Sequence, residues 1–195
     1  MDMAILVLAG GGSKRFGEDK ALFRLNGKPL IQHVVERISG LSEELLISCK
    51  RKKEVFEKMF PRAKVIEDEW DEESALAGLL SSLPHIRSEY VAVIACDSPR
   101  VSPRVIESLF AWARTHDGAV PIWPNGYLEP LQAVYRTSSL FTVAEDKWVR
   151  RERRLKNLLD SMEDIIYVPI TELKRVDPKL DSFLNINSPN DLKLI

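Results

Sequence analysis

The stretch AILVLAGGG (Ala4–Gly12) places six apolar residues directly before three glycines. An apolar run without polar alternation is typical of a strand that is buried on both faces of a sheet. Consecutive glycines let the backbone turn tightly and point successive N–H groups at one anion, because no Cβ is in the way. The stretch therefore predicts a buried strand that ends in an anion-binding loop.

The rest of the chain alternates further apolar runs with helical patterns, and its helix starts carry clear signals. Pro29 is expected at the first position of a helix with LIQHVVERIS (30–39) that Gly40 ends, and Ser102 followed by Pro103 is typical of another helix start. This alternation indicates an α/β fold: one doubly wound, mostly parallel sheet with helices on both faces, in a single domain over residues 1–195. The other predicted strands are ELLISC (44–49), AKVIE (63–67), YVAVIAC (90–96), GAVPIW (118–123), LQAVY (131–135), IIYVPI (165–170) and FLNI (183–186).

Composition limits the classes of function. Apolar residues make up 45% and charged residues 29%, and no apolar run approaches the ~18 residues that a membrane helix needs. We therefore expect a globular cytoplasmic protein without a membrane partner. A formal net charge of −1 argues against general nucleic-acid binding, which usually requires a basic face. Cys49 and Cys96 both end predicted strands and are expected to be small buried hydrophobic residues.

The glycine-rich loop matches neither of two familiar phosphate loops. The G-x-G-x-x-G pattern requires glycine where Arg15 stands, and the Walker A pattern requires lysine where Glu18 follows Gly17. Lys14, Arg15 and Lys20 instead follow the glycines in a long loop that is able to wrap a triphosphate. The alternative is a glycine-rich surface turn with solvated charges.

Two aspartates follow predicted strands, where the ligands of such sheets gather. Asp97 comes after YVAVIAC, and its carboxylate is suited to hold Mg²⁺ that bridges phosphate oxygens; the alternative is an ordinary turn before Ser98 and Pro99. Asp68 ends another strand and is suited to accept hydrogen bonds from guanine N1–H and N2–H, a donor pair that cytosine lacks. Its alternative is a solvated acidic loop over 67–73.

Two further groups of polar residues have a binding and a structural interpretation. Asn185 and Asn187 alternate on the predicted last strand, so their side chains are expected to share one ligand; the alternative is simple turn capping. The basic run over 150–154, with Lys156, either holds a phosphate of the acceptor or forms the solvated start of a helix.

The stretch from Leu8 to Leu30 resembles the signature L-A-G-G-x-S-x-R-F/M-G-x-D-K-A-L, followed by N-G-K-P-L, of the nucleotidyltransferases that attach GMP or CMP to molybdopterin. The resemblance is strongest to the molybdenum cofactor guanylyltransferase family. It continues in the family's order and spacing through VIED (65–68), LAGLLSSL (76–83), ACDSP (95–99), EPLQAVY (129–135) and FLNINSPNDL (183–192). It implies a nucleotidyltransferase fold and a Mg²⁺-dependent transfer of GMP from GTP to the terminal phosphate of molybdopterin, with release of pyrophosphate.

The resemblance also implies a role for each residue of the opening loop. The amides of Gly10, Gly11 and Gly12 would cradle the phosphates. Arg15 would offset charge on the departing pyrophosphate, and Lys20 would contact the transferring phosphoryl group.

The remaining implied roles lie at the strand ends. Asp97 would hold the metal, Asp68 would read the base, and Leu8 and Ala9 would meet the base through their backbone. Asn185 or Asn187 would hold the metal or the acceptor. The activity further implies contact with a molybdoenzyme or a delivery protein that receives the finished cofactor.

Three departures from the family pattern bear on base and acceptor. Ser74-Ala75 stands where members commonly have Gly-Pro, Glu129 stands where they commonly have His, and Ser48 or Cys49 falls where guanine-specific members can carry asparagine. Two other readings therefore stay open. One is a cytidylyltransferase on the same acceptor or a sugar- or polyol-phosphate nucleotidyltransferase, and the other is a non-catalytic nucleotide-binding regulator.

Overall fold

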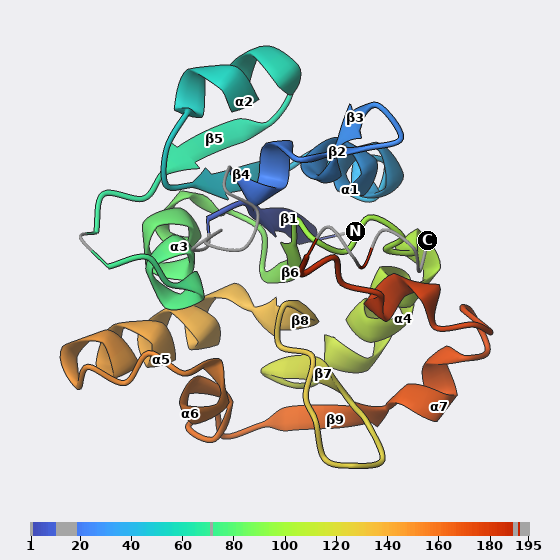
Figure 1. Cartoon of the computed structure of the whole chain (residues 1–195). Helices are drawn as coiled ribbons and strands as arrows, with labels where there is room; N and C mark the ends of the chain where they lie inside the picture. Colours follow the sequence, from blue (N-terminus) through green and yellow to red (C-terminus); the bar gives the residue numbers. More distant parts are fainter. Residues whose placement is uncertain (1, 11–18, 71, 189–190, 192–195) are drawn as a thin grey trace.

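A twisted sheet runs through the middle of the molecule in the computed structural model (Figure 1). The structure describes residues 2–10, 19–70, 72–188 and 191. Within these residues the sheet has seven strands in the order β5-β4-β1-β6-β8-β7-β9. Their bounds are β1 Met3–Leu8, β4 Leu45–Cys49, β5 Lys64–Glu67, β6 Tyr90–Ala95, β7 Gly118–Ile122, β8 Gln132–Arg136 and β9 Ile165–Pro169.

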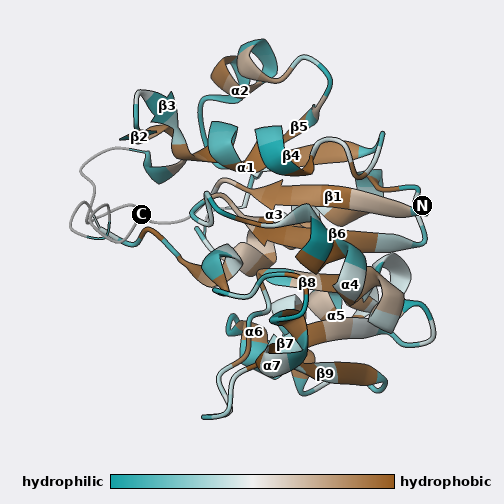
Figure 2. Ribbon diagram, turned by 90° about the vertical axis from the view of Figure 1, so that its right-hand side faces the viewer, coloured by the Kyte–Doolittle hydropathy of each residue, from teal (hydrophilic) through white to brown (hydrophobic). Residues whose placement is uncertain are grey.

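The strand directions confirm the predicted mostly parallel sheet. The pairs β1–β4, β1–β6, β4–β5 and β7–β9 are parallel, whereas β8 is antiparallel to both of its neighbours. The carboxyl ends of β5, β4, β1 and β6 therefore meet at one edge together with the hairpin between β7 and β8. Figure 2 shows this edge at the left, because β1 begins near the N-terminus at the right and runs leftward.

The predicted strand over 183–186 is wrong. Asp181–Phe183 forms a 3-10 turn (η3), and the residues that follow belong to no strand. The backbone N–H of Ile186 donates instead to the carbonyl of Asp97, 2.9 Å away, just beyond the end of β6. The segment thus crosses the ends of the strands, where there is no ladder for it to join, although the side chain of Ile186 is buried.

Helices cover both faces of the sheet, as the sequence predicts (Figure 1). The side chains of β1 alternate between two cores, Met3, Ile5 and Val7 facing one and Ala4, Leu6 and Leu8 the other. The first core is covered by α1 Leu30–Ile38, α2 Lys53–Met59, α4 Pro103–Ala113 and α7 Ile170–Leu173, and the second by α3 Ala75–Ser82, α5 Thr137–Val149 and α6 Leu155–Leu159. Short elements complete the fold: η1 Lys20–Leu22, η2 Leu83–His85 and the hairpin of β2 Arg24–Leu25 with β3 Lys28–Pro29.

Local signals set several boundaries. Ser102 caps α4 with Pro103 in its first turn, as predicted, although its hydroxyl makes no capping hydrogen bond. Pro29 is the cap of α1 rather than its first residue. Asn26 and Gly27 both have positive φ, 50° and 81°, the conformation that Asn-Gly adopts readily in a two-residue hairpin turn. No helix among the described residues has both the length and the apolar character needed to span a bilayer.

Candidate active site

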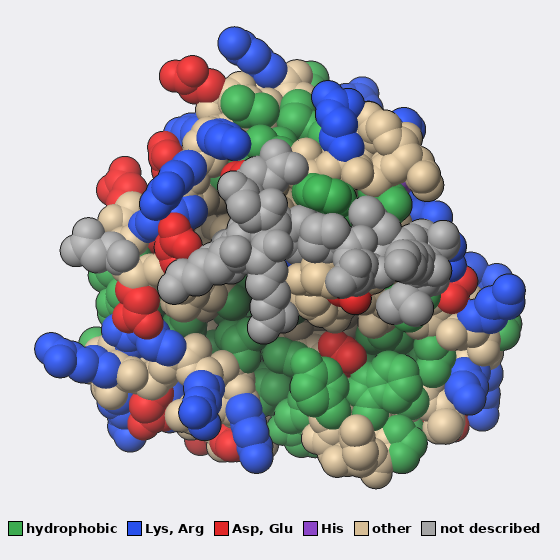
Figure 3. All heavy atoms as spheres, in the orientation of Figure 1, with side chains coloured by type: hydrophobic (Ala, Val, Ile, Leu, Met, Phe, Trp, Pro, Cys, Tyr) green, Lys and Arg blue, Asp and Glu red, His purple; other side chains and the backbone are tan. Residues whose placement is uncertain are grey.

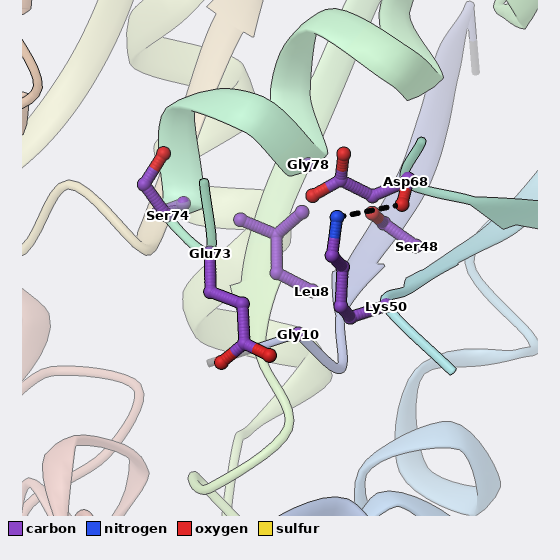
Figure 4. A pocket seen from close by; sticks show the side chains of 9 residues that line it. Leu8, Gly10, Ser48, Lys50, Asp68, Glu73, Ser74 and Gly78 are labelled. Carbon is purple, nitrogen blue, oxygen red and sulfur yellow. Dashed lines mark hydrogen bonds between the residues drawn. The ribbon is translucent and has the colours of Figure 1, made fainter. Parts of the chain in front are cut away.

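A pocket opens where β1, β4 and β5 end (Figure 4). Its walls come from the ends of these strands and from the loop and first turn of α3. Figure 4 shows Leu8, Lys50 and Asp68 converging from the strands, with Glu73 and Ser74 opposite. The complete lining is Leu8, Gly10, Ser48, Lys50, Asp68, Glu73, Ser74, Ala75 and Gly78.

Asp68 is a buried carboxylate in this pocket, and only 6% of the residue is exposed. Its Oδ1 accepts hydrogen bonds from the N–H of Trp70 at 2.9 Å and from the hydroxyl of Ser81 at 3.4 Å. Within the part of the chain that the structure describes, no hydrogen bond engages Oδ2. Burial raises the pKa of Asp68, while the Trp70 bond opposes that rise. The solvated-loop interpretation therefore does not hold for Asp68, whose second oxygen is available to a ligand.

Lys50 holds the loop that follows Asp68. Its Nζ donates to the carbonyl of Asp68 at 3.1 Å and also to the carbonyl of Trp70. Sequence reasoning missed Lys50, although its position one residue after the ELLISC strand was a usable signal, since ligands gather at strand ends.

Two residues, Ser74 and Gly78, place helix α3 against the pocket. The hydroxyl of Ser74 accepts from the N–H of Ala77 at 3.1 Å, so the departure from Gly-Pro at this position provides an N-cap for α3. Gly78 lets the helix approach the strands closely, because a Cβ there would lie 2.9 Å from the Ser48 hydroxyl.

Lys20, Asp97 and Asn187 form a second cluster beside the pocket. The Lys20 ammonium lies 2.5 Å from Asp97 Oδ2 and 3.0 Å from Asn187 Oδ1. The carboxylate of Asp19 caps η1 by accepting from the N–H of Ala21 at 3.1 Å, which fixes the start of the turn that carries Lys20. The structure thus joins residues that lie far apart in the sequence into one polar site.

The other oxygen of Asp97 is suited to a cation. Among the described residues Oδ1 is buried without a hydrogen-bond partner, and leaving a buried carboxylate oxygen unsatisfied is costly. The same part of the chain contains no group of three or more His, Cys, Asp or Glu side chains able to hold a metal. Mg²⁺ commonly binds through one or two carboxylates together with substrate phosphates and water, so Asp97 fits such a site.

Asn185 and Asn187 have different side-chain partners within the protein, and their predicted contact with one ligand stays a prediction. Asn185 Oδ1 accepts from the hydroxyl of Ser98 at 2.7 Å, whereas Asn187 contacts Lys20. Because the segment is not a strand, its side chains lack the regular alternation that the prediction assumed. Asn185 fastens the segment to the end of β6, and Asn187 belongs to the polar cluster.

The other residues of the opening loop are described only in part. Gly11, Gly12 and Arg15 lie outside the described residues. The carbonyl of Leu8 accepts from the N–H of Cys96 at 3.1 Å, and the N–H of Ala9 donates to Ser48 at 2.7 Å. Leu8 therefore reaches the pocket with its side chain, and the predicted backbone contacts of Leu8 and Ala9 to a base stay a prediction.

Arginines of the basic run over 150–154 contact other side chains of the protein. The Arg153 guanidinium lies 3.8 Å from the ring centroid of Trp148 and bonds Glu72 at 2.8 Å. Trp148 in turn packs on Trp70 at 4.4 Å between ring centroids. These contacts attach the loop after Asp68 to α5, and together with the Arg150–Asp146 pair they favour the structural interpretation of the run. Cys49 and Cys96 are buried, as predicted.

The sheet edge joins the pocket of Asp68 to the cluster of Lys20, Asp97 and Asn187. This arrangement is that of a nucleotidyltransferase, and the comparisons with known proteins agree with this class. Residues 5–165 match the family model of the MobA-like NTP transferase domain, so the chain belongs to this family.

Three relatives illustrate the likeness. A probable molybdenum cofactor guanylyltransferase of Methanosarcina mazei is 31% identical, with 96% of this chain and 87% of the relative covered. The molybdenum cofactor guanylyltransferase of Pseudomonas putida (strain GB-1) is 36% identical, with 80% and 81% covered. The crystal structure of molybdopterin-guanine dinucleotide biosynthesis protein A from Archaeoglobus fulgidus superimposes with a TM-score of 0.82 at 31% identity, covering 98% of this chain and 95% of that one. The predicted family and fold are confirmed.

Proposed function

We propose that this nucleotidyltransferase transfers GMP from GTP to the terminal phosphate of molybdopterin, which forms molybdopterin guanine dinucleotide and releases pyrophosphate. The observation that carries the proposal is the buried Asp68 carboxylate on the same sheet edge as the Lys20–Asp97–Asn187 cluster. The relatives from Methanosarcina mazei and Pseudomonas putida, named as a probable molybdenum cofactor guanylyltransferase and a molybdenum cofactor guanylyltransferase, support this substrate pair.

The pocket favours guanine as the base. Guanine presents N1–H and N2–H side by side, and Asp68 offers an oxygen that no described residue engages. Cytosine presents no such donor pair. A site that pairs a buried polar group with the substrate rejects analogues that leave the group unpaired, often by large factors.

The strand order supports an extended nucleotide across the edge. Asp68 follows β5 and Asp97 follows β6, and three strand spacings of ~4.8 Å, about 14 Å, separate these strands. A base held by Asp68 therefore directs its phosphates over the end of β1, toward Lys20. The amides of Gly10, Gly11 and Gly12 are proposed to bind these phosphates, and Arg15 to offset charge on the leaving pyrophosphate.

The reaction needs little beyond positioning and charge neutralisation. An oxygen of the acceptor phosphate forms a bond to the α-phosphorus of GTP while the bond between that phosphorus and the α–β bridging oxygen breaks. A phosphate monoester is already anionic at neutral pH, so no general base is required. Lys20 is proposed to contact the transferring phosphoryl group, and Asn187 orients Lys20. Mg²⁺, held by Asp97, would supply further charge neutralisation on the phosphate oxygens when bound.

The test is a direct assay of product formation. Purified protein is incubated with Mg²⁺, molybdopterin and one of GTP, CTP, ATP or UTP, and both the dinucleotide and pyrophosphate are measured. We expect product with GTP and a loss of product in Asp97→Asn, whose folding is checked by its thermal midpoint. Product with CTP instead of GTP would replace the proposal with the cytidylyl alternative, and no product with any nucleotide would refute both.

A further inference from the structure

The hairpin between β7 and β8 borders the polar cluster on the side away from the nucleotide pocket. Hydrogen bonds close its turn: the N–H of Trp123 donates to Tyr127 at 2.8 Å, the N–H of Gly126 donates to Trp123 at 2.8 Å, and Ile122 pairs with Leu128. Gly126 has φ +81°, a conformation that favours glycine. These backbone contacts define the path of the hairpin between the two strands.

Glu129 is fixed in this hairpin through both backbone and side chain. Its N–H donates to Pro121 at 3.0 Å, its carbonyl accepts from Gln132 at 3.2 Å, and its Oε1 accepts from the indole Nε1 of Trp123 at 2.8 Å. Burial raises the pKa of Glu129, and the negative charge of Asp97 adds to the rise, while the Trp123 bond opposes it. Within the described residues the indole is the one hydrogen-bond donor to this carboxylate.

The sheet register places Glu129 next to Asp97. The N–H of Ala95 donates to Leu131 at 2.9 Å across the antiparallel pair of β6 and β8. Asp97 is two residues beyond Ala95, and Glu129 is two residues before Leu131, so the two carboxylates leave the same end of adjacent strands. Two strand spacings, about 10 Å, separate β8 from β1 and its phosphate loop.

Trp123, whose indole binds this carboxylate, and the buried Phe183 form an apolar wall beside it. Trp123 and Phe183 meet edge to face, with ring centroids 6.1 Å apart. Figure 3, in the orientation of Figure 1, shows hydrophobic side chains gathered in front of β8 and β7, with an acidic side chain among them. Near them Gln132 is 3% exposed, and its Nε2 has no hydrogen-bond partner among the described residues. A flat apolar ligand with a polar edge matches such a surface.

We propose that Glu129 determines acceptor specificity: its carboxylate accepts hydrogen bonds from the adjacent N–H groups of the acceptor's aminopyrimidinone edge, while the wall formed by Trp123 and Phe183 contacts the face of the fused ring. The inference rests on the proposed function, because it takes the heterocycle of molybdopterin as the ligand. Asp68 and Glu129 would then recognise the same donor pair at opposite ends of the site, one on the nucleotide and one on the acceptor.

The chemistry favours recognition over a role in bracing the hairpin alone. Glu129 is half-buried, and a partly desolvated carboxylate is costly unless several donors satisfy it. One neutral indole N–H offsets only part of that cost. A glutamine would accept the same indole bond without a charge. The carboxylate gains its advantage from a ligand that brings two donors.

The test compares two probes that differ at this edge. Pterin carries a 2-amino group beside its ring N–H, whereas lumazine carries a carbonyl there. Binding of each probe to the full chain is measured by isothermal calorimetry. We expect the wild type to prefer pterin by about tenfold or more, and Glu129→Gln to lose or reverse that preference, because its amide presents one donor and one acceptor. Trp123→Phe, which keeps the aromatic packing but removes the indole donor, should retain most of it.

The outcomes separate this inference from the proposed function. In the turnover assay Glu129→Gln should raise the KM for molybdopterin while the KM for GTP stays unchanged. Guanylyl transfer by the wild type together with an unchanged pterin preference in Glu129→Gln would overturn the inference alone. A Glu129-dependent pterin preference without guanylyl transfer would overturn the proposed function alone. No preference for pterin at millimolar probe in the wild type would overturn the inference.

Discussion

Replacing Asp68 with asparagine tests base recognition at a single atom. Asparagine is able to keep its Oδ1 on the Trp70 N–H, 2.9 Å away, which places its amide nitrogen where Oδ2 faced the pocket. A donor then meets the guanine donors. A buried mispairing of this kind costs about 1–3 kcal/mol, so the preference for GTP over ITP, which lacks the 2-amino group, should fall by roughly tenfold or more.

The assay is the ratio of kcat/KM for GTP to that for ITP, measured for each variant with the same acceptor. A ratio within one protein cancels general damage to folding or to metal binding. Ser81→Ala is the matched control, because its hydroxyl contacts the same carboxylate at 3.4 Å without facing a base, and its ratio should stay close to wild type. Burial raises the pKa of Asp68, so the ionised carboxylate destabilises the fold at neutral pH. Asp68→Asn should therefore keep or raise the thermal midpoint. An unchanged GTP/ITP ratio in Asp68→Asn would refute base recognition by this residue.

Further predictions concern the cluster, the pH dependence and the helix contact. Lys20→Ala should lower kcat more than it raises the KM for GTP, and equal effects in initial-rate measurements would make Lys20 a binding residue. Asp97→Asn should abolish turnover with an unchanged thermal midpoint, and near-wild-type rates at saturating Mg²⁺ would remove Asp97 from the site. Because the pKa of Asp68 is raised, protonation should reduce the GTP/ITP preference while the pH is still above ~4, the ordinary value for aspartate; a constant ratio down to that pH would contradict this. Gly78→Ala places a Cβ 2.9 Å from the Ser48 hydroxyl and should cost about 1–3 kcal/mol in denaturant unfolding, with part of the loss recovered by adding Ser48→Ala.

The sequence predicts the central strands well because each is a local apolar run that is buried on both faces. Asp97 is found by the same reasoning, since it directly follows such a run. The segment over 183–186 shows the limit of the method. A short apolar run has the same sequence pattern whether it pairs with a neighbouring strand or crosses the strand ends. The hydrogen bond from Ile186 to Asp97 determines its position, and this bond joins residues far apart in the chain.

The missed residues have a common physical reason. Lys50 acts on backbone carbonyls of another loop, and the stack of Trp70, Trp148 and Arg153 joins two segments about eighty residues apart. Such contacts depend on tertiary packing, and no local pattern specifies them. Glu129 was visible in the sequence as a departure from the family pattern, yet its indole partner required the folded hairpin.

The antiparallel strand β8 divides the sheet edge into two parts whose residues are able to change independently of each other. Because β8 is antiparallel to β7, the connection between them, which faces the cluster from this side, is a hairpin rather than a crossover helix. Hairpin loops accept insertions and substitutions more readily than the elements that they connect. A lineage or a protein engineer is thus free to remodel residues 123–131 for a different acceptor while the strands that carry Asp68 and Asp97 stay intact, as an exchange of this hairpin between relatives would show.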